Sequence, residues 1–167
     1  MSNGGLDTEL YTAFVPSPVG YAQIKANEES IVSILFTENL EHESSHPPKV
    51  LKDCVKQVTE YFNGKRKEFT VPLEQQGTLF QQKVWKELCQ IPAGKTISYL
   101  QLAKKIGNAK SIRAVGTANG RNNICVIVPC HRVIGSDGSL TGYGGGLWRK
   151  QWLLEHEAKL MGVHKLF

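Results

Sequence analysis

Hydrophobic and polar residues alternate in three short runs near the start of the chain. The runs Leu10–Val15, Tyr21–Ala26 and Ile31–Phe36 are separated by turn residues, including a Pro-Ser-Pro segment at 16–18. Alternation with a period of two is typical of half-buried strands, and short turns between such strands favour antiparallel pairing. The pattern predicts a small antiparallel sheet.

A helical pattern replaces the alternation after residue 50. Apolar residues recur every three or four positions from Leu51 to Phe62, and the repeat ends at Asn63-Gly64, a normal C-terminal stop. We expect an amphipathic helix that covers one face of the sheet. His42 and His46 lie four residues apart in a polar stretch that is more typical of a surface loop than of a metal site.

Mainly helical patterns follow. Thr78 and Gln81 fit a capping box at the start of one helix. A second helix is predicted from Tyr99 to Ile106, with Gly107 just beyond its end, and a third from Ser111 to Gly120. Two helices joined by a short glycine-containing turn have the proportions of a helix-turn-helix.

A break at residues 75–77 predicts two domains, 1–76 and 77–167. The first carries 7 Lys/Arg against 11 Asp/Glu, and the second carries 13 against 4. A polyanion would prefer the second domain, although solvated surface charge is the ordinary interpretation. Small residues along the third predicted helix fit either tight core packing or close approach to a bulky partner. Arg113 favours DNA, because a long cation among small residues can enter a groove.

Composition narrows the class of protein. A chain of 167 residues with 41% hydrophobic and 21% charged residues has the balance of a globular protein. No apolar run approaches the roughly 20 residues that span a bilayer, and residues 1–14 lack the features of a signal peptide. We therefore expect an intracellular protein, cytoplasmic and in a eukaryote also nuclear. The four cysteines form no CxxC pair, which argues against a disulfide framework and a common zinc site.

The most informative segment runs from Ile124 to Gly135. Its apolar start predicts a β-like run up to Pro129, which places Cys130 at the mouth of a buried pocket with His131 beside it. A thiol with an unperturbed pKa of about 8.5 is barely ionised at pH 7, so a nucleophilic cysteine needs a base or a positive field. His131 and Arg132 offer both. The other cysteines are interpreted as small buried hydrophobes: Cys54, Cys89 and Cys125.

The segment Pro129-Cys130-His131-Arg132-Val133 resembles the active-site signature of the O6-alkylguanine-DNA alkyltransferases. The similarity extends from about Phe80 to Glu157, whereas the first half of the chain is similar only in outline. It is carried by ordered matches at Val84-Trp85, Ile97-Ser98-Tyr99, Arg113-Ala114-Val115-Gly116, Asn119-Gly120, Tyr143-Gly144-Gly145-Gly146 and Trp152-Leu153-Leu154-Glu155-His156-Glu157. The resemblance implies an α+β fold, in which a ribonuclease H-like sheet with its helix precedes a mainly helical, winged-helix-like domain.

The resemblance also implies direct-reversal DNA repair. An alkyl group would pass irreversibly from O6 of a flipped-out guanine to Cys130, once per protein molecule. His131 would act as the base through a water, and Glu157 would orient His131. Asn122 would brace the turn. Tyr99 would protonate the leaving guanine and contact a phosphate.

The expected partner is double-stranded DNA, bound by a monomer largely independently of sequence, with no cofactor and no metal. Arg113 corresponds to the finger that fills the gap in the base stack. Further expected DNA contacts are Ser111, Ala114, Asn119 and Arg132. The expected substrate pocket comprises Val133, Tyr143, Gly144 and Gly145, whose glycines would let the backbone approach the base. Activity on O4-alkylthymine and the preferred size of the alkyl group stay open.

Three other functions compete with this interpretation. A cysteine hydrolase built on Cys130 and His131 would turn over repeatedly and leaves the helix-turn-helix unexplained. A non-catalytic binder of alkylated DNA would have another residue in place of Cys130. A transcription regulator would need a second module, for which this chain is too short.

Overall fold

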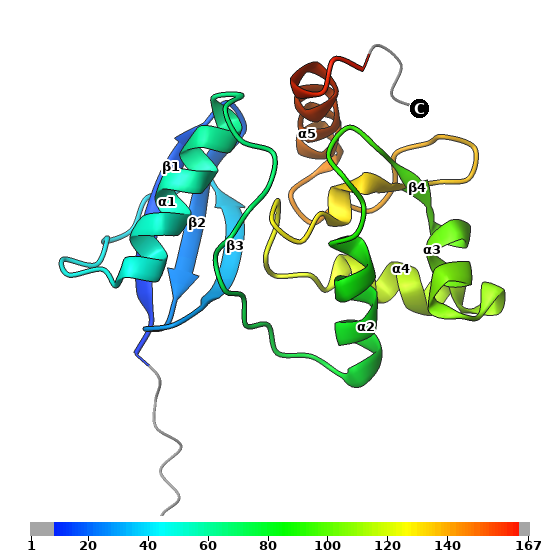
Figure 1. Ribbon diagram of the computed structural model, residues 1–167, viewed down its shortest axis with the longest axis horizontal. Coiled ribbons are helices and arrows are strands. Elements are labelled where there is room, and N and C mark those ends of the chain that lie inside the picture. Colours follow the sequence, from blue (N-terminus) through cyan, green and yellow to red (C-terminus); the bar gives the residue numbers. More distant parts are fainter. Residues whose placement is uncertain (1–8, 164–167) are drawn as a thin grey trace, which may run out of the picture.

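The computed structural model describes residues 9–163, and it confirms an α+β fold. Figure 1 shows a three-stranded sheet with one helix across it, beside a mainly helical second half. The elements in chain order are β1 (Tyr11–Ser17), β2 (Gly20–Ala26), β3 (Ile31–Thr37), α1 (Lys49–Phe62), α2 (Leu79–Leu88), β4 (Ile97–Ser98), α3 (Tyr99–Ile106), α4 (Ile112–Gly120), β5 (Val133–Ile134) and α5 (Leu147–Leu160). Short 3-10 turns cover Ala109–Ser111 and Cys130–Arg132.

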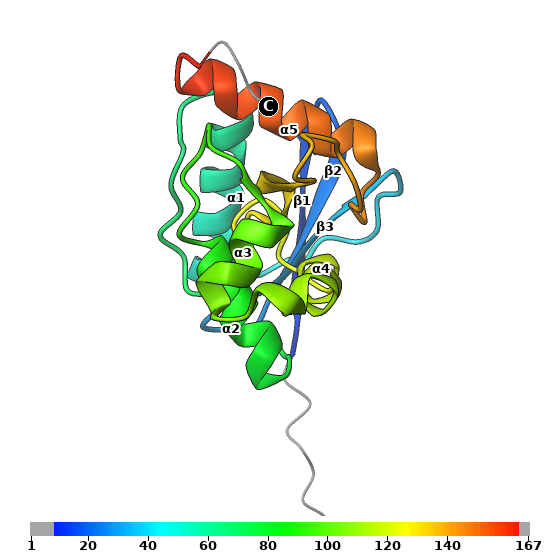
Figure 2. The same ribbon diagram turned by 90° about the vertical axis from the view of Figure 1, so that its right-hand side faces the viewer.

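The sheet has the order β1-β2-β3, and both pairings are antiparallel, as the alternating runs predict. Helix α1 packs on one face of the sheet (Figure 2). The contact is made through a fully buried stripe at helical spacing. This stripe consists of Leu51, Cys54, Val58 and Tyr61. Burial of such a stripe holds the helix in place, since each large apolar side chain contributes about 1.5–3 kcal/mol.

The helix ends agree with the sequence signals. Thr78 and Gln81 form the expected capping box at the start of α2. Ser98 and Gln101 form a second capping box, which starts α3. Helix α3 ends at Gly107, whose φ of 106° favours glycine. The turn between α3 and α4 is therefore fixed by backbone chemistry, and the predicted helix-turn-helix is present.

The apolar run before Pro129 is not a strand, contrary to expectation. Residues 124–128 form a compact turn in which Val126 has a φ of 74°. The side chain of Asn122 holds this turn: its Oδ1 accepts from the Ile124 amide at 3.0 Å and its Nδ2 donates to the Val128 carbonyl at 2.8 Å. These bonds take the place of a strand ladder, because buried backbone groups need partners.

The first half of the chain anchors this turn. The amide of Ile34 in β3 donates to the Asn123 carbonyl at 2.8 Å, and the Cys125 amide donates to the Ile34 carbonyl at 3.0 Å. The edge of the N-terminal sheet thus continues into the segment that leads to Cys130. The division into domains 1–76 and 77–167 stays a prediction.

Candidate active site

Cys130 begins a 3-10 turn and lies at the wall of a cavity of about 280 Å³. Only 5% of its surface is exposed. The cavity has one wall from β3, one from the C-terminal end of α4 and one from the glycine loop. Its volume lies just below the range of about 300–1,000 Å³ that is usual for small-molecule pockets. A single flat ring system is therefore an occupant of suitable size.

The environment of Cys130 makes its thiol easier to ionise. The Cys125 thiol donates a hydrogen bond to the Cys130 sulfur and lowers the pKa of Cys130, against the opposing effect of burial. Asn122 and the charge of Lys150 lower the same pKa further. Cys125 was predicted to be only a small hydrophobe. The structure instead places it against Cys130, and its own pKa is raised well above the ordinary value.

His131 follows Cys130 and is fully buried. Its Nε2 lies 3.0 Å from Oε2 of Glu157 on α5. The Glu157 carboxyl is completely buried, which by itself would raise its pKa, but His131 and Arg132 lower that pKa far below its ordinary value. Glu157 is therefore an anion, and it accepts the proton on Nε2. This leaves Nδ1 of His131 unprotonated whenever the ring is neutral.

The Nδ1 atom of His131 has no hydrogen-bond partner among the described residues. Burial lowers the pKa of His131, although Glu157 opposes this effect. The imidazole is therefore neutral at physiological pH and has one free basic nitrogen. A neutral histidine held in one tautomer by a carboxylate has the arrangement of a general base.

Lys150 on α5 is a second charged group at the site, and the sequence pattern does not predict it. Its side chain is fully buried, its Nζ donates to the Thr141 carbonyl at 2.7 Å, and it lies 5.8 Å from the centre of the Tyr99 ring. Burial lowers the pKa of Lys150 to about 8, while the nearby Cys130 opposes this shift. Burying a cation without a carboxylate partner lowers the stability of the folded protein. The nearby Cys130 thiol, which can ionise to an anion, is the most direct explanation for a buried lysine at this position.

Tyr99, the first residue of α3, donates from its hydroxyl to the same Thr141 carbonyl at 3.2 Å. Burial raises the pKa of Tyr99, and the charge on Cys130 adds to this effect. The hydroxyl therefore keeps its proton near neutral pH and is available as a donor. Tyr99 and Lys150 thus converge on one carbonyl, close to Cys130.

The glycine loop forms part of the cavity wall, as the sequence analysis expected for Tyr143, Gly144 and Gly145. A Cβ at Gly145 would lie 3.0 Å from the Tyr143 ring and 3.2 Å from the Arg149 side chain, so the close approach requires glycine. Val133 does not line the cavity, contrary to expectation. It is fully buried in β5 and pairs with Ile97 of β4.

Comparison with known proteins decides the family. A model of the 6-O-methylguanine DNA methyltransferase DNA binding domain matches residues 79–159, and a model of the ribonuclease-like domain of the same family matches residues 10–75. The chain belongs to the 6-O-methylguanine DNA methyltransferase family. Among the described residues, no helix is long and apolar enough to cross a membrane.

Relatives of this methyltransferase family match along most of their length. The chain is 40% identical over 153 residues to the methylated-DNA-protein-cysteine methyltransferase of Methanosarcina barkeri, covering 89% of this chain and 97% of the relative. The O6-methylguanine methyltransferase of Mycobacterium tuberculosis has a crystal structure similar to this one, with a TM-score of 0.81, 41% identity and coverage of 90% and 94%. The mycobacterial protein in complex with DNA matches with a TM-score of 0.79 and 43% identity, covering 88% of this chain and 92% of that chain. These matches indicate DNA as a partner of this chain.

In this methyltransferase, the helix-turn-helix surface carries positive charge. No Asp or Glu occurs between Leu88 and Ser136. Arg113 and Ala114 are exposed on α4, and Ser111 at its start is half-buried. Five other exposed cations lie in this stretch: Lys95, Lys104, Lys105, Lys110 and Arg121. A polyanion would be attracted to this concentration of exposed cations.

Two expected DNA contacts are corrected by the structure. Asn119 is 2% exposed, lines the Cys130 cavity and donates from Nδ2 to the Cys130 carbonyl at 3.3 Å. Arg132 is 6% exposed, and its Nε and Nη2 donate to Glu157 at 2.8 Å each. Arg132 is therefore not available to a phosphate, and Asn119 lies at the cavity rather than on the exposed face of α4.

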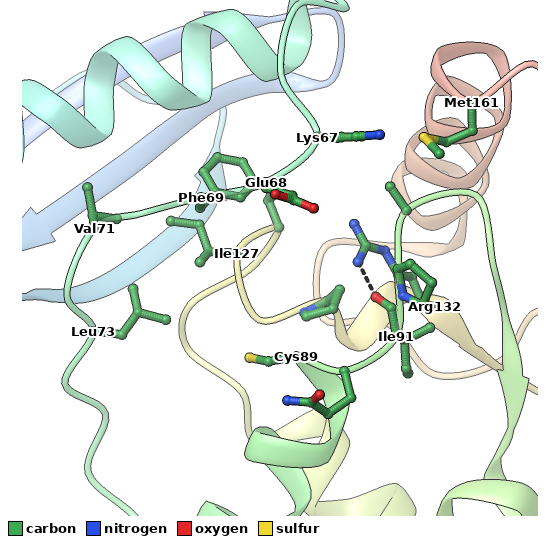
Figure 3. Close-up of a pocket in the computed structure, with 15 residues that line it drawn as sticks. Lys67, Glu68, Phe69, Val71, Leu73, Cys89, Ile91, Ile127, Arg132 and Met161 are labelled. Carbon is green, nitrogen blue, oxygen red and sulfur yellow. Dashed lines mark hydrogen bonds between the residues drawn. The ribbon is translucent and has the colours of Figure 1, made fainter.

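A larger cavity of about 500 Å³ lies on the other side of Arg132. Figure 3 shows the Arg132 guanidinium donating to the Ile91 carbonyl at its wall, with Cys89 and Phe69 further along it. Cys130 and Tyr99 do not line this cavity. Of these two cavities, the smaller one is lined by Cys130.

Proposed function

We propose that this protein repairs DNA by direct reversal, transferring an alkyl group from O6 of guanine to Cys130 once per protein molecule. One observation carries the proposal: a buried thiol with a lowered pKa lies at a small cavity, and the histidine after it is neutral with a free Nδ1. The names of the relatives, methylated-DNA-protein-cysteine methyltransferases, support the same chemistry.

The chemistry is a displacement at carbon. The Cys130 proton passes through a water to Nδ1 of His131, and the resulting imidazolium is stabilised by Glu157. The thiolate then forms a bond to the alkyl carbon while the bond from that carbon to O6 breaks. The electron pair of the broken bond stays on guanine, which takes a proton from the Tyr99 hydroxyl. The proton held by His131 then returns through water to the Tyr99 oxygen, so both side chains regain their starting protonation states. The net reaction moves one alkyl group from oxygen to sulfur and one proton from sulfur to guanine, with no cofactor.

Access to the thiol requires a flipped nucleotide. Cys130 is buried, so a base stacked inside a duplex cannot reach it. The exposed Arg113 on α4 would fill the gap that the flipped guanine leaves. The small residues around Arg113 allow close approach to the groove, and contacts to the phosphates make binding by the monomer largely independent of sequence.

Intact-protein mass spectrometry with duplex DNA that contains one O6-methylguanine tests the proposal. We expect the mass of one methyl group to be added per protein, and no further product when excess DNA is supplied. The Cys130→Ser variant and an unmodified duplex serve as controls, and neither should give a mass gain. Repeated turnover would instead indicate a cysteine hydrolase. Tight binding without a mass gain would indicate a damage-recognition protein, and either result would overturn the proposal.

A further inference from the structure

A residue of the N-terminal half contacts the buried His131-Glu157 pair of the C-terminal half, which we call the relay. Tyr61 lies near the end of α1, is fully buried, and donates from its hydroxyl to Oε2 of Glu157 at 2.7 Å. The two residues are 96 positions apart in the chain. The helix pattern predicts only that Tyr61 is part of the apolar stripe, so this contact depends on the tertiary structure.

The oxygen that Tyr61 contacts is the one that holds His131. Oε2 of Glu157 accepts from Tyr61 at 2.7 Å, from Nη2 of Arg132 at 2.8 Å and from Nε2 of His131 at 3.0 Å. Oε1 accepts from Nε of Arg132 at 2.8 Å. The carboxylate is therefore fixed from two directions, by Arg132 next to the active-site turn and by Tyr61 from the opposite half of the chain.

The hydroxyl of Tyr61 acts only as a donor in this network. Burial raises the pKa of Tyr61 well above its ordinary value, and the Glu157 charge raises it further. The ring is held by Phe69 at 5.7 Å and His156 at 5.1 Å between ring centres. Its backbone carbonyl also accepts from Nε2 of His156 at 2.6 Å. The phenol is thus held in one orientation and stays protonated.

We propose that Tyr61 is a positioning residue of the alkyl-transfer site, through which the N-terminal half sets the orientation and the basicity of the His131-Glu157 pair. A hydrogen bond to an ionised carboxylate lowers its proton affinity. The Tyr61 bond therefore keeps the shared proton on Nε2 of His131 and leaves Nδ1 as the proton acceptor. It also limits how strongly Glu157 stabilises the imidazolium, which keeps the pKa of His131 low. This inference rests on the proposed function for its kinetic consequences only.

The Tyr61→Phe variant removes one oxygen atom and keeps the ring. We expect the single-turnover rate of methyl transfer at saturating duplex to fall about five- to tenfold at pH 7, because Glu157 loses one of the hydrogen bonds that fix its orientation towards His131. Affinity for the duplex should stay within about twofold, since the Tyr61 side chain is fully buried. The pKa of His131, followed by NMR of the imidazole, should rise because Glu157 becomes a stronger base.

The matched control is Phe62→Leu. Phe62 lies next to Tyr61 and packs against Trp152 of α5 at 5.8 Å between ring centres, and its phenyl ring has no group that could donate a hydrogen bond to Glu157. This variant should lower the melting temperature without changing the transfer rate or the pKa of His131. A Tyr61→Phe variant that behaves like Phe62→Leu would overturn the inference. If the unmodified chain transfers no methyl group, the proposed function fails, and the NMR titration still decides whether Tyr61 tunes His131.

Discussion

Cys54 of the first half and Cys130 of the second half are both buried, and the two thiols differ in how easily they ionise. Cys54 lies in the apolar stripe of α1, where burial alone raises its pKa to about 12. Cys130 is equally shielded from solvent, yet its pKa is lowered because Cys125 donates to its sulfur and because Asn122 and Lys150 are close. Burial by itself makes a thiol inert, and placed donors and charges make it a nucleophile.

The halves also differ in the charge that they present. The first 76 residues are acidic overall and the remainder is basic. The positive residues gather around the helix-turn-helix, while the N-terminal half contributes two internal supports to the site. One is the β3 edge at Ile34, and the other is the Tyr61 hydroxyl. We therefore expect the second half to contact DNA and the first half to support the active site.

The largest effect is expected for Glu157→Gln, which removes the anion at the centre of the relay. Arg132 would keep its buried charge without a partner, so we expect a loss of about 3–5 kcal/mol in the free energy of unfolding. Methyl transfer should fall by about 100-fold or more, because His131 loses the group that fixes its tautomer. Urea denaturation and single-turnover kinetics measure both effects.

The direction of the Glu157 pKa shift predicts how the stability of the protein changes with pH. The pKa of Glu157 is lowered in the folded protein, so its stabilising effect is complete above the unfolded value of about 4.3. That contribution diminishes as the pH falls below this value towards the folded pKa, and Glu157→Gln should lack this part of the acid sensitivity. The matched control is Glu155→Gln, an exposed position on the same helix, which should change stability by less than about 0.5 kcal/mol. Equal losses of stability and of transfer rate at the two positions would contradict the role proposed for Glu157.

Arg113→Ala tests the assignment of DNA contact to the second half. Arg113 is exposed on α4, and its loss should weaken duplex binding roughly tenfold and reduce the dependence of binding on salt. Fluorescence anisotropy at several salt concentrations measures both quantities. Lys65→Ala, an exposed cation of the first half, should bind within about twofold of the parent. Equal losses at the two positions would show that the two halves do not differ in this respect.

Lys150→Met separates activity from stability. The transfer rate at pH 7 should fall about tenfold, because the thiolate loses a buried positive charge. Stability at pH 7 should not decrease, since the lowered pKa of about 8 means that the charge is disfavoured in the folded protein. That penalty is complete below pH 8 and is relieved as the pH rises towards the unfolded value, so the gain from the variant should shrink in alkaline solution. A variant with lower stability and an unchanged rate would contradict this role.

The smallest effect is expected for Cys125→Ala. The Cys130 thiol would lose its main hydrogen-bond donor, so its pKa should rise and the transfer rate at pH 7 should fall about threefold. The rate should recover as the pH is raised, and the pH profile of single-turnover transfer measures the shift. Cys54→Ala removes a thiol from the core of the first half. It should lower stability by about 1 kcal/mol or more and leave the pH profile unchanged.

Local chemistry made much of the fold predictable from the sequence. Short-range sequence patterns determine several features: the three strands, the stripe of α1, the capping box at Thr78 and the helix end at Gly107. The run at 124–128 was misjudged, because a short apolar run has the same periodicity whether it is a strand or a buried turn. Its conformation depends on side-chain bonds from Asn122.

The errors at the site have a common physical origin. Arg132 and Asn119 were expected at the DNA surface, but each is buried with a partner that only the fold brings to it. Lys150 and Tyr61 were missed for the same reason, since their partners are brought to them only by the fold. The resemblance supplied Cys130, His131, Glu157 and Asn122, but it did not supply three further residues that affect the site: Tyr61, Cys125 and Lys150.

The most direct test of the account locates the transferred group. The full chain is mixed with duplex DNA containing one O6-methylguanine, digested, and its four cysteines are examined by peptide mass spectrometry. The account predicts S-methylcysteine at Cys130 alone, in proportion to the lesion repaired, with unmodified thiols at Cys54, Cys89 and Cys125. A methyl group at Cys125, or repair of the guanine with no methylated cysteine, would contradict it.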